Sequence, residues 1–231
     1  MKVIILAAGL GTRLLPLTET IPKPLIKISG ITIIDRIFQS LPNEIEEVII
    51  IVEHLKEKIK NHVGEKFYNR KVTYVNQGNK RGTFGALLSA KDILLKDERF
   101  LVLNGDDIHD KQELENYLKH PRSLGVQKMI LPNYYAVQLD QNKYVSDFSP
   151  QSNEEKKYGT LIATGAYVID SNIFEHPGIV VYGGEYGLPQ TILAQKDKYP
   201  IMAITTLKWR PINFISDIEK TEKILFDFPS K

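Results

Sequence analysis

The stretch of sequence that most constrains the fold runs from residue 6 to residue 25. A short apolar run, Val3 to Leu6, leads into it and predicts a buried strand that ends in a turn. Gly9 and Gly11 follow, and glycines let the backbone turn sharply and bring its N–H groups close to a ligand. The chain is therefore expected to begin with a strand whose carboxyl end opens into a glycine-containing loop.

Two cations and three prolines follow these glycines. Arg13 has a planar guanidinium that suits phosphate oxygens, and Lys23 provides a compact point charge. Pro16, Pro22 and Pro24 restrict the backbone where these cations must be held. Because a concave row of backbone amides also binds anions, the stretch predicts a loop that binds a polyphosphate. The alternative is a tight turn with solvated charges.

Strand and helix patterns alternate through the first half of the chain. They predict strands at 47–53, 71–76 and 100–103, and helices at 32–41, 54–67 and 83–96. Alternation at this spacing is typical of a parallel sheet that helices cover on both faces. The expected fold class is α/β, a three-layer α/β/α sandwich with a mostly parallel, mixed, Rossmann-like sheet.

The second half of the chain is less regular. The expected elements are strands at 125–131, 136–147, 159–170 and 201–206, a helix at 187–195, and a polar surface loop at 151–157. Ser216 and Glu219 have the spacing of a capping box, which predicts a closing helix to about residue 226. No internal repeat or linker divides the chain, so we expect a single domain over residues 1–231.

Composition excludes several classes of protein. The chain has 231 residues, of which 42% are hydrophobic, enough for one sizeable core. The net charge is only +2 and basic residues are interspersed with acidic ones, so no nucleic-acid partner is expected. The absence of cysteine excludes disulfides and thiolate metal sites. The apolar start is too short for a signal peptide and no run has membrane-spanning length, so we expect a cytoplasmic protein without a membrane partner.

A pair of carboxylates follows the strand expected at 100–103. Asp106 and Asp107 come directly after Asn104 and Gly105. Ligands of parallel α/β sheets bind beyond the carboxyl ends of the strands, so this pair and the glycine loop could face one crevice. Mg²⁺ prefers oxygen ligands and keeps several waters, so one or two protein ligands suffice to hold it. The alternative is a solvated acidic turn.

The N-terminal loop resembles the signature of the sugar-1-phosphate nucleotidylyltransferase family, G-x-G-T-R-x-x-P-L-T-x-x-x-P-K. The matching residues are Gly9, Gly11, Thr12, Arg13, Pro16, Leu17, Thr18, Pro22 and Lys23. The resemblance implies the nucleotide-diphospho-sugar transferase fold, with a nucleotide-binding half at about 1–110 and an acceptor-binding half at about 111–231. It also implies transfer of a nucleotidyl group from a nucleoside triphosphate to a sugar 1-phosphate, which gives an NDP-sugar and pyrophosphate.

The charged residues suit that reaction. Its nucleophile is a phosphate oxygen that is largely ionised near neutral pH, because the second pKa of a phosphate is about 6. The reaction therefore needs charge neutralisation and in-line positioning rather than a general base. The resemblance implies that Arg13 stabilises the triphosphate and the departing pyrophosphate. It likewise implies that Lys23 holds phosphate oxygens at the reacting centre and that Mg²⁺ bridges the two substrates.

The resemblance also assigns metal ligands and substrate contacts. Asp106 matches the first metal ligand of the family; Asn213 stands where relatives carry the second, with Asp217 in reserve. The nucleotide-binding residues that it implies are Leu6, Ala8, Gly9, Gly11, Thr12, Gln77, Gly82 and Thr83. Gln77 occupies the position at which relatives read the base edge. The implied acceptor-binding residues are Asp107, Gly165 and Glu185.

The acceptor side departs from the family pattern. Relatives often carry Glu-Lys-Pro where this chain has Phe148-Ser149-Pro150, and that lysine usually meets the sugar phosphate. Its role passes to Lys156, to Lys157 or to no residue. The departure leaves open a second reaction, transfer from CTP to a phosphorylated alcohol such as phosphocholine. A non-catalytic sensor of nucleotide sugars is the alternative from another class. The nucleobase, the sugar and homo-oligomerisation stay open.

Overall fold

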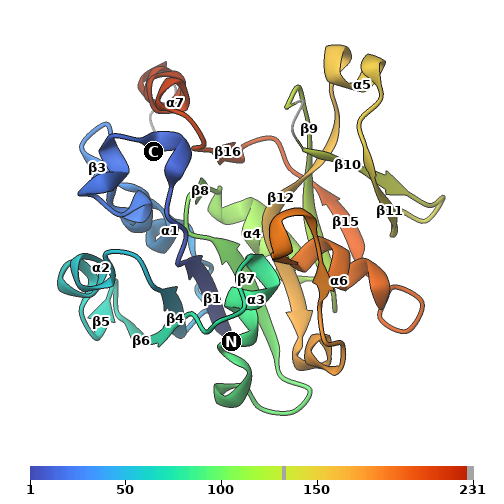
Figure 1. Ribbon diagram of the computed structural model, residues 1–231, viewed down its shortest axis with the longest axis horizontal. Helices are drawn as coiled ribbons and strands as arrows, with labels where there is room; N and C mark the ends of the chain where they lie inside the picture. Colours follow the sequence, from blue (N-terminus) through green and yellow to red (C-terminus); the bar gives the residue numbers. More distant parts are fainter. Residues whose placement is uncertain (132–133, 228–231) are drawn as a thin grey trace.

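The computed structural model describes residues 1–131 and 134–227. One eight-stranded sheet runs through the molecule in the order β15-β9-β12-β7-β1-β4-β6-β5 (Figure 1). Its strands are β1 (Lys2–Ala7), β4 (Glu47–Val52), β5 (Lys66–Phe67), β6 (Arg70–Asn76), β7 (Arg99–Asn104), β9 (Ser123–Met129), β12 (Thr160–Asp170) and β15 (Met202–Thr205).

The sheet is mixed, as the sequence predicts. β1 pairs in parallel with β4 and β7, and β4 does so with β6. β12 runs antiparallel to both β7 and β9, and β15 returns parallel to β9. The parallel half therefore comes from the first part of the chain, and the antiparallel strand β12 joins it to the second part.

Both faces of the sheet are buried. Along β1, Val3 and Ile5 belong to one hydrophobic core and Ile4 to another, because successive side chains point to opposite faces. Helices α1 (Ile33–Ser40), α2 (Lys56–Val63) and α4 (Lys111–Leu118) pack on the first core. Helices α3 (Thr83–Leu88) and α6 (Leu188–Ala194) pack on the second (Figure 1). The three-layer α/β/α prediction is confirmed.

Within the described residues, short strands form four two-stranded sheets outside the main one. They pair β2 (Lys27–Ile28) with β3 (Ile31–Thr32), β8 (Asp107–Ile108) with β16 (Arg210–Pro211), β10 (Tyr135–Leu139) with β11 (Val145–Pro150), and β13 (Ile179–Val180) with β14 (Tyr186–Gly187). The other two α-helices of the described residues are α5 (Asn153–Tyr158) and α7 (Ile215–Asp227). Among the described residues, no helix has the length and apolar character needed to cross a membrane.

Three predicted elements are interrupted in the structure. The helix expected at 54–67 ends at Val63, because Gly64 takes a positive φ of 69° and the chain turns into β5. The helix expected at 83–96 ends at Leu88 and is followed by a separate 3-10 turn. The strand expected at 136–147 is instead divided between β10 and β11, because the Asp140 carboxylate accepts the N–H groups of Asn142 and Tyr144 and closes a turn.

Two helix starts also differ from the prediction. The segment expected as a loop at 151–157 contains α5, whose capping box joins Ser152 and Glu155. Conversely, Ser216 does not begin the last helix. That helix begins at Ile215, and the carboxylate of Asp217 accepts the N–H groups of Asn213 and Phe214, each at 2.9 Å.

Candidate active site

The glycine loop and the acidic pair leave the sheet side by side. In the parallel pair of β1 and β7, Leu6 lies opposite Asn104. Just beyond, the N–H of Gly105 donates to the carbonyl of Leu6 at 2.9 Å. A Cβ on Gly105 would lie 2.8 Å from that carbonyl oxygen, so this approach requires glycine. The two predicted functional loops therefore meet at one edge of the sheet.

The glycine loop is fixed mainly at Gly11. Its φ of 67° lies in the left-handed region, and a Cβ there would come 2.8 Å from the side chain of Thr18. The hydroxyl of Thr18 donates to the Gly11 carbonyl at 2.8 Å. Nothing lies within 4 Å of a Cβ built on Gly9, so packing does not demand glycine there. The missing side chain instead leaves the loop open on the side of the larger cavity described below.

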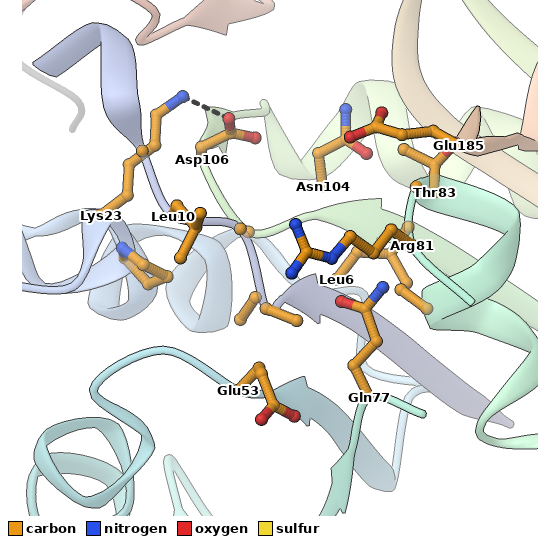
Figure 2. A pocket seen from close by; sticks show the side chains of 18 of the residues that line it. Leu6, Leu10, Lys23, Glu53, Gln77, Arg81, Thr83, Asn104, Asp106 and Glu185 are labelled. Atoms are coloured by element: carbon orange, nitrogen blue, oxygen red, sulfur yellow. Dashed lines mark hydrogen bonds and ion pairs between the residues drawn. The ribbon is translucent and has the colours of Figure 1, made fainter. Parts of the chain in front are cut away.

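Lys23 and Asp106 form an ion pair across this edge. Lys23 begins a 3-10 turn between Pro22 and Pro24, and its ammonium contacts Oδ2 of Asp106 (Figure 2). The side chains of Lys23 and Asp106 are 13% and 32% exposed. Partial burial strengthens such a pair relative to one in open water. The structure thus brings together the cation and the metal ligand that the resemblance implies.

Asp107 lies near this pair and is shielded from solvent. It is 4% exposed and accepts a hydrogen bond from Nδ2 of Asn104 at 3.1 Å. Burial raises the pKa of Asp107 well above its usual value, and the charge of Asp106 adds to this, while Lys23 and Asn104 oppose it. Gly165 has a φ of 70°, and a Cβ there would clash with Asn104 and lie 2.7 Å from Oδ2 of Asp107.

The segment that contains Asn213, in the last part of the sequence, lies beside the acidic turn of Asp106 and Asp107. The antiparallel pair of β8 and β16 places Pro211 opposite Asp107, and the N–H of Ile212 donates to the carbonyl of Asp106 at 3.3 Å. The amide nitrogen of Asn213 donates to the hydroxyl of Tyr134 at 2.8 Å. No donor to the amide oxygen of Asn213 is found among the described residues, so this oxygen is available as a ligand.

Carboxylate and amide oxygens such as those of Asp106 and Asn213 are the type of ligand that a hard cation such as Mg²⁺ takes, together with water. The carboxylate of Asp217, the alternative second ligand, accepts hydrogen bonds from two backbone N–H groups, which favours a role in holding the backbone rather than a metal. Within residues 1–131 and 134–227, no cluster of three or more His, Asp or Glu side chains forms a dedicated metal cage. The protein donor set is therefore small, and the remaining ligands of a cation held there would have to come from water or from a bound molecule.

A cavity of about 800 Å³ opens beside the ion pair (Figure 2). The predicted site residues that line it are Leu6, Ala8, Gly9, Gly11, Thr12, Lys23, Gln77, Gly82, Thr83, Asp106 and Glu185. The amide nitrogen of Gln77 donates to the carbonyl of Lys80 at 3.0 Å, which fixes this side chain at the cavity wall. Gly82 has a φ of 90°, and a Cβ there would lie 2.5 Å from the backbone of Tyr186.

A second cavity, of about 290 Å³, adjoins the first. It is lined by Arg13, Thr83, Asn104, Tyr134, Tyr135, Phe148, Ile162, Ala163, Gly165, Tyr167, Pro189 and Gln190. Thr83 and Asn104 line both cavities, so the two spaces share a wall. The hydroxyl of Thr83 accepts the N–H of Leu188 at 2.9 Å, which ties this wall to α6.

Three predicted site residues, Arg13, Glu185 and Asp107, stand apart from the others in their position relative to the two cavities. Arg13, assigned to the triphosphate, lines the smaller cavity, and Glu185, assigned to the acceptor, lines the larger. Asp107, also assigned to the acceptor, is not among the lining residues of either cavity. The prediction missed Arg81 in the larger cavity and Tyr134 in the smaller, and no motif marks either position.

Comparison with known proteins places the chain in a family. The family model described as nucleotidyl transferase matches residues 2–179. The chain belongs to the nucleotidyl transferase family. The bifunctional protein GlmU of Methanocaldococcus jannaschii is 38% identical over 180 residues, which cover 76% of this nucleotidyl transferase and 41% of GlmU. The chain thus spans about two fifths of that relative.

Other relatives match this nucleotidyl transferase over nearly its whole length. UTP--glucose-1-phosphate uridylyltransferase AglF of Haloferax volcanii is 29% identical over 238 residues, 97% of this chain and 96% of AglF. UDP-glucose pyrophosphorylase in complex with UDP-glucose superposes with a TM-score of 0.83 at 19% identity, over 98% of both chains. A putative glucose-1-phosphate thymidylyltransferase from Bacillus anthracis gives 0.81 at 20% identity, over 100% of this chain and 97% of the other. These structures share the fold.

Proposed function

We propose that the chain transfers a nucleotidyl group from a nucleoside triphosphate to a sugar 1-phosphate and releases pyrophosphate. The observation that carries this proposal is the pair of adjoining cavities. The larger takes the triphosphate and the smaller takes the acceptor, and they share Thr83 and Asn104. Two anionic substrates can then meet at one wall, where proximity and orientation lower the barrier.

The side chains of the site would act mainly on charge. Lys23 would contact phosphate oxygens at the reacting phosphorus, since its ammonium already lies at the edge of the larger cavity. Arg13 would contact the acceptor phosphate from the smaller cavity, with a guanidinium that can bind two oxygens at once. The acceptor phosphate is its own nucleophile, so the site has to hold and align the substrates without taking up a proton.

Asp106 and Asn213 would hold Mg²⁺ through one carboxylate and one amide oxygen. Bound there, the ion would offset negative charge on the phosphates of both substrates. In the absence of a second carboxylate, the protein supplies a single negative charge, so the substrate phosphates would complete the ligand set. Tyr134 would orient Asn213, because its hydroxyl accepts the hydrogen bond from the amide nitrogen.

The smaller cavity is rich in aromatic side chains, contributed by Tyr134, Tyr135, Phe148 and Tyr167. Aromatic rings pack against the apolar face of a sugar ring, and they also attract a trimethylammonium group. The second property is the observation that favours phosphocholine as an alternative acceptor, with CTP as the donor.

A panel of triphosphates and acceptors tests the proposal. Pyrophosphate release is measured with UTP, CTP, ATP, GTP and dTTP, each paired with several sugar 1-phosphates or with phosphocholine. We expect turnover with at least one sugar 1-phosphate. Turnover with phosphocholine alone would replace the sugar assignment, and nucleotide-sugar binding without turnover in any pair would favour the sensor.

A further inference from the structure

The lining of the larger cavity includes a cationic side chain to which the proposed reaction assigns no role. Arg81 lines this cavity, and Figure 2 shows its guanidinium extending into the space between Gln77 and the pair formed by Lys23 and Asp106. Its guanidinium makes no ion pair or hydrogen bond with the described residues. The head of this side chain is therefore free to meet a ligand.

The backbone that carries Arg81 is firmly held. Its carbonyl accepts the N–H of Tyr186 at 2.8 Å, and the carbonyl of Lys80 accepts the amide of Gln77 at 3.0 Å. Gly82, the next residue, is packed against the backbone of Tyr186 too closely for any side chain. Because the backbone of Arg81 is already fixed, binding a ligand through its guanidinium costs less conformational entropy than binding through a residue in a mobile loop.

The charges that line the larger cavity show why a bound triphosphate would need this cation. The charged lining side chains are Lys23, Glu53, Arg81, Asp106 and Glu185, two cations against three carboxylates, a sum of −1. Lys23 is already paired with Asp106, and Arg13 lines the smaller cavity. A strongly anionic triphosphate would enter a space whose free charges are mostly negative unless Arg81 or a metal ion offsets them.

We propose that the guanidinium of Arg81 binds the β- and γ-phosphates of the triphosphate. It extends toward Leu10 of the glycine loop, so a phosphate chain on that loop would lie between backbone N–H groups and the guanidinium (Figure 2). A planar fork binds two phosphate oxygens at once. The contribution of Arg81 to affinity must then grow with the number of phosphates. This inference rests on the proposed nucleotide site.

Lys80 provides a matched control for Arg81. It precedes Arg81 in the same loop, but its ammonium lies 4.8 Å from the centre of the Tyr186 ring, and it is not among the residues that line either cavity. Arg81→Met and Lys80→Met each remove one positive charge and keep a flexible apolar chain. Both side chains are exposed, so both variants are expected to fold.

The experiment measures binding of nucleotides to the wild-type protein and both variants by calorimetry in the presence of Mg²⁺. The probes are the tri-, di- and monophosphate of whichever of the five common nucleotides the wild type binds most tightly. For Arg81→Met we expect triphosphate affinity to fall about tenfold or more, diphosphate affinity to fall less, and monophosphate affinity to change less than about twofold. Lys80→Met should leave all three within about twofold.

Three results would overturn the assignment. They are an equal loss for the mono-, di- and triphosphate, an equal loss in the two variants, or no loss in Arg81→Met. If the wild type binds no triphosphate at all, the nucleotide site itself is wrong, together with any contact assigned within it. If the wild type binds triphosphate and Arg81→Met binds it equally well, only the role of Arg81 falls.

Discussion

The contact between Lys23 and Asp106 joins two sequence motifs that lie 83 residues apart. One carries the proline-flanked cation and the other the acidic turn, and each alone has an ordinary surface interpretation. Their meeting at the ends of two neighbouring parallel strands favours the functional interpretation of both. The ammonium also neutralises a carboxylate that would otherwise repel an incoming phosphate.

Replacing Asp106 by alanine separates its chemical role from its structural one. We expect Asp106→Ala to lower kcat at least about 100-fold, because the site loses the carboxylate proposed to hold Mg²⁺. Stability should change by only about 1 kcal/mol, since the side chain is a third exposed and solvent screens the ion pair. Pyrophosphate release measures the effect on kcat, Mg²⁺-dependent nucleotide binding tests its proposed cause, and thermal unfolding measures the effect on stability. Near-normal turnover in this variant would remove Asp106 from the metal role.

Gly165 gives a stability prediction with an internal control. Gly165→Ala should cost about 2–4 kcal/mol, from a positive φ and from overpacking against Asn104 and Asp107. Gly183 has a similar φ of 82° but nothing within 4 Å of its Cβ, so Gly183→Ala should cost only about 1 kcal/mol. Urea unfolding of the two variants measures the difference. Equal losses would show that Gly165 is not constrained by its neighbours.

At the scale of elements, the pairing of β8 with β16 determines how the second half completes the site. This pairing brings the segment that precedes α7 alongside the acidic turn. Asn213 therefore lies next to the first turn of α7. Asn213 and Asp217, the two candidates for the proposed second metal ligand, are therefore also bound to each other, because the backbone N–H of Asn213 donates to the carboxylate of Asp217.

Variants of these two residues distinguish the roles. Asn213→Ala should weaken Mg²⁺-dependent triphosphate binding about tenfold, as the loss of one oxygen ligand and its support would. Asp217→Asn should leave that binding within about twofold and stability nearly unchanged, because the amide oxygen of asparagine can still accept the N–H groups of Asn213 and Phe214. Asp217→Ala removes this acceptor and should cost about 1 kcal/mol of stability. Calorimetry and urea unfolding measure these effects. A large loss of metal-dependent binding in Asp217→Asn would instead make Asp217 the ligand.

The elements that the sequence predicts best are those buried on both faces. β4 and β7 read as continuous apolar runs, which is the pattern of parallel strands under helices on both sides. α5 buries no residue, so it has no apolar periodicity, and only its capping box marks it. The smaller cavity escaped prediction because its aromatic residues come from separate strands, and sequence spacing does not reveal which side chains converge. Arg81 is exposed in a loop and follows no pattern.

At the scale of the whole molecule, the two cavities follow the division of the sheet. Loops after β1, β6 and β7 in the parallel half line the larger cavity. Strands β10, β11 and β12 and the start of α6 supply much of the smaller one. The division of one continuous domain into a nucleotide-binding half and an acceptor-binding half stays a prediction. The signature residues of the family lie in the parallel half of the sheet.

The segment from Gln77 to Thr83 is hydrogen-bonded to the chain that runs through Tyr186 and Leu188. These neighbours lead directly to Pro189 and Gln190 in the wall of the smaller cavity. If each cavity takes one substrate as proposed, a substitution that reshapes the space for one substrate will also shift the surface that meets the other. Selectivity for the two substrates would then evolve jointly. Changing the specificity for only one substrate by engineering would require compensating substitutions in both of these hydrogen-bonded segments.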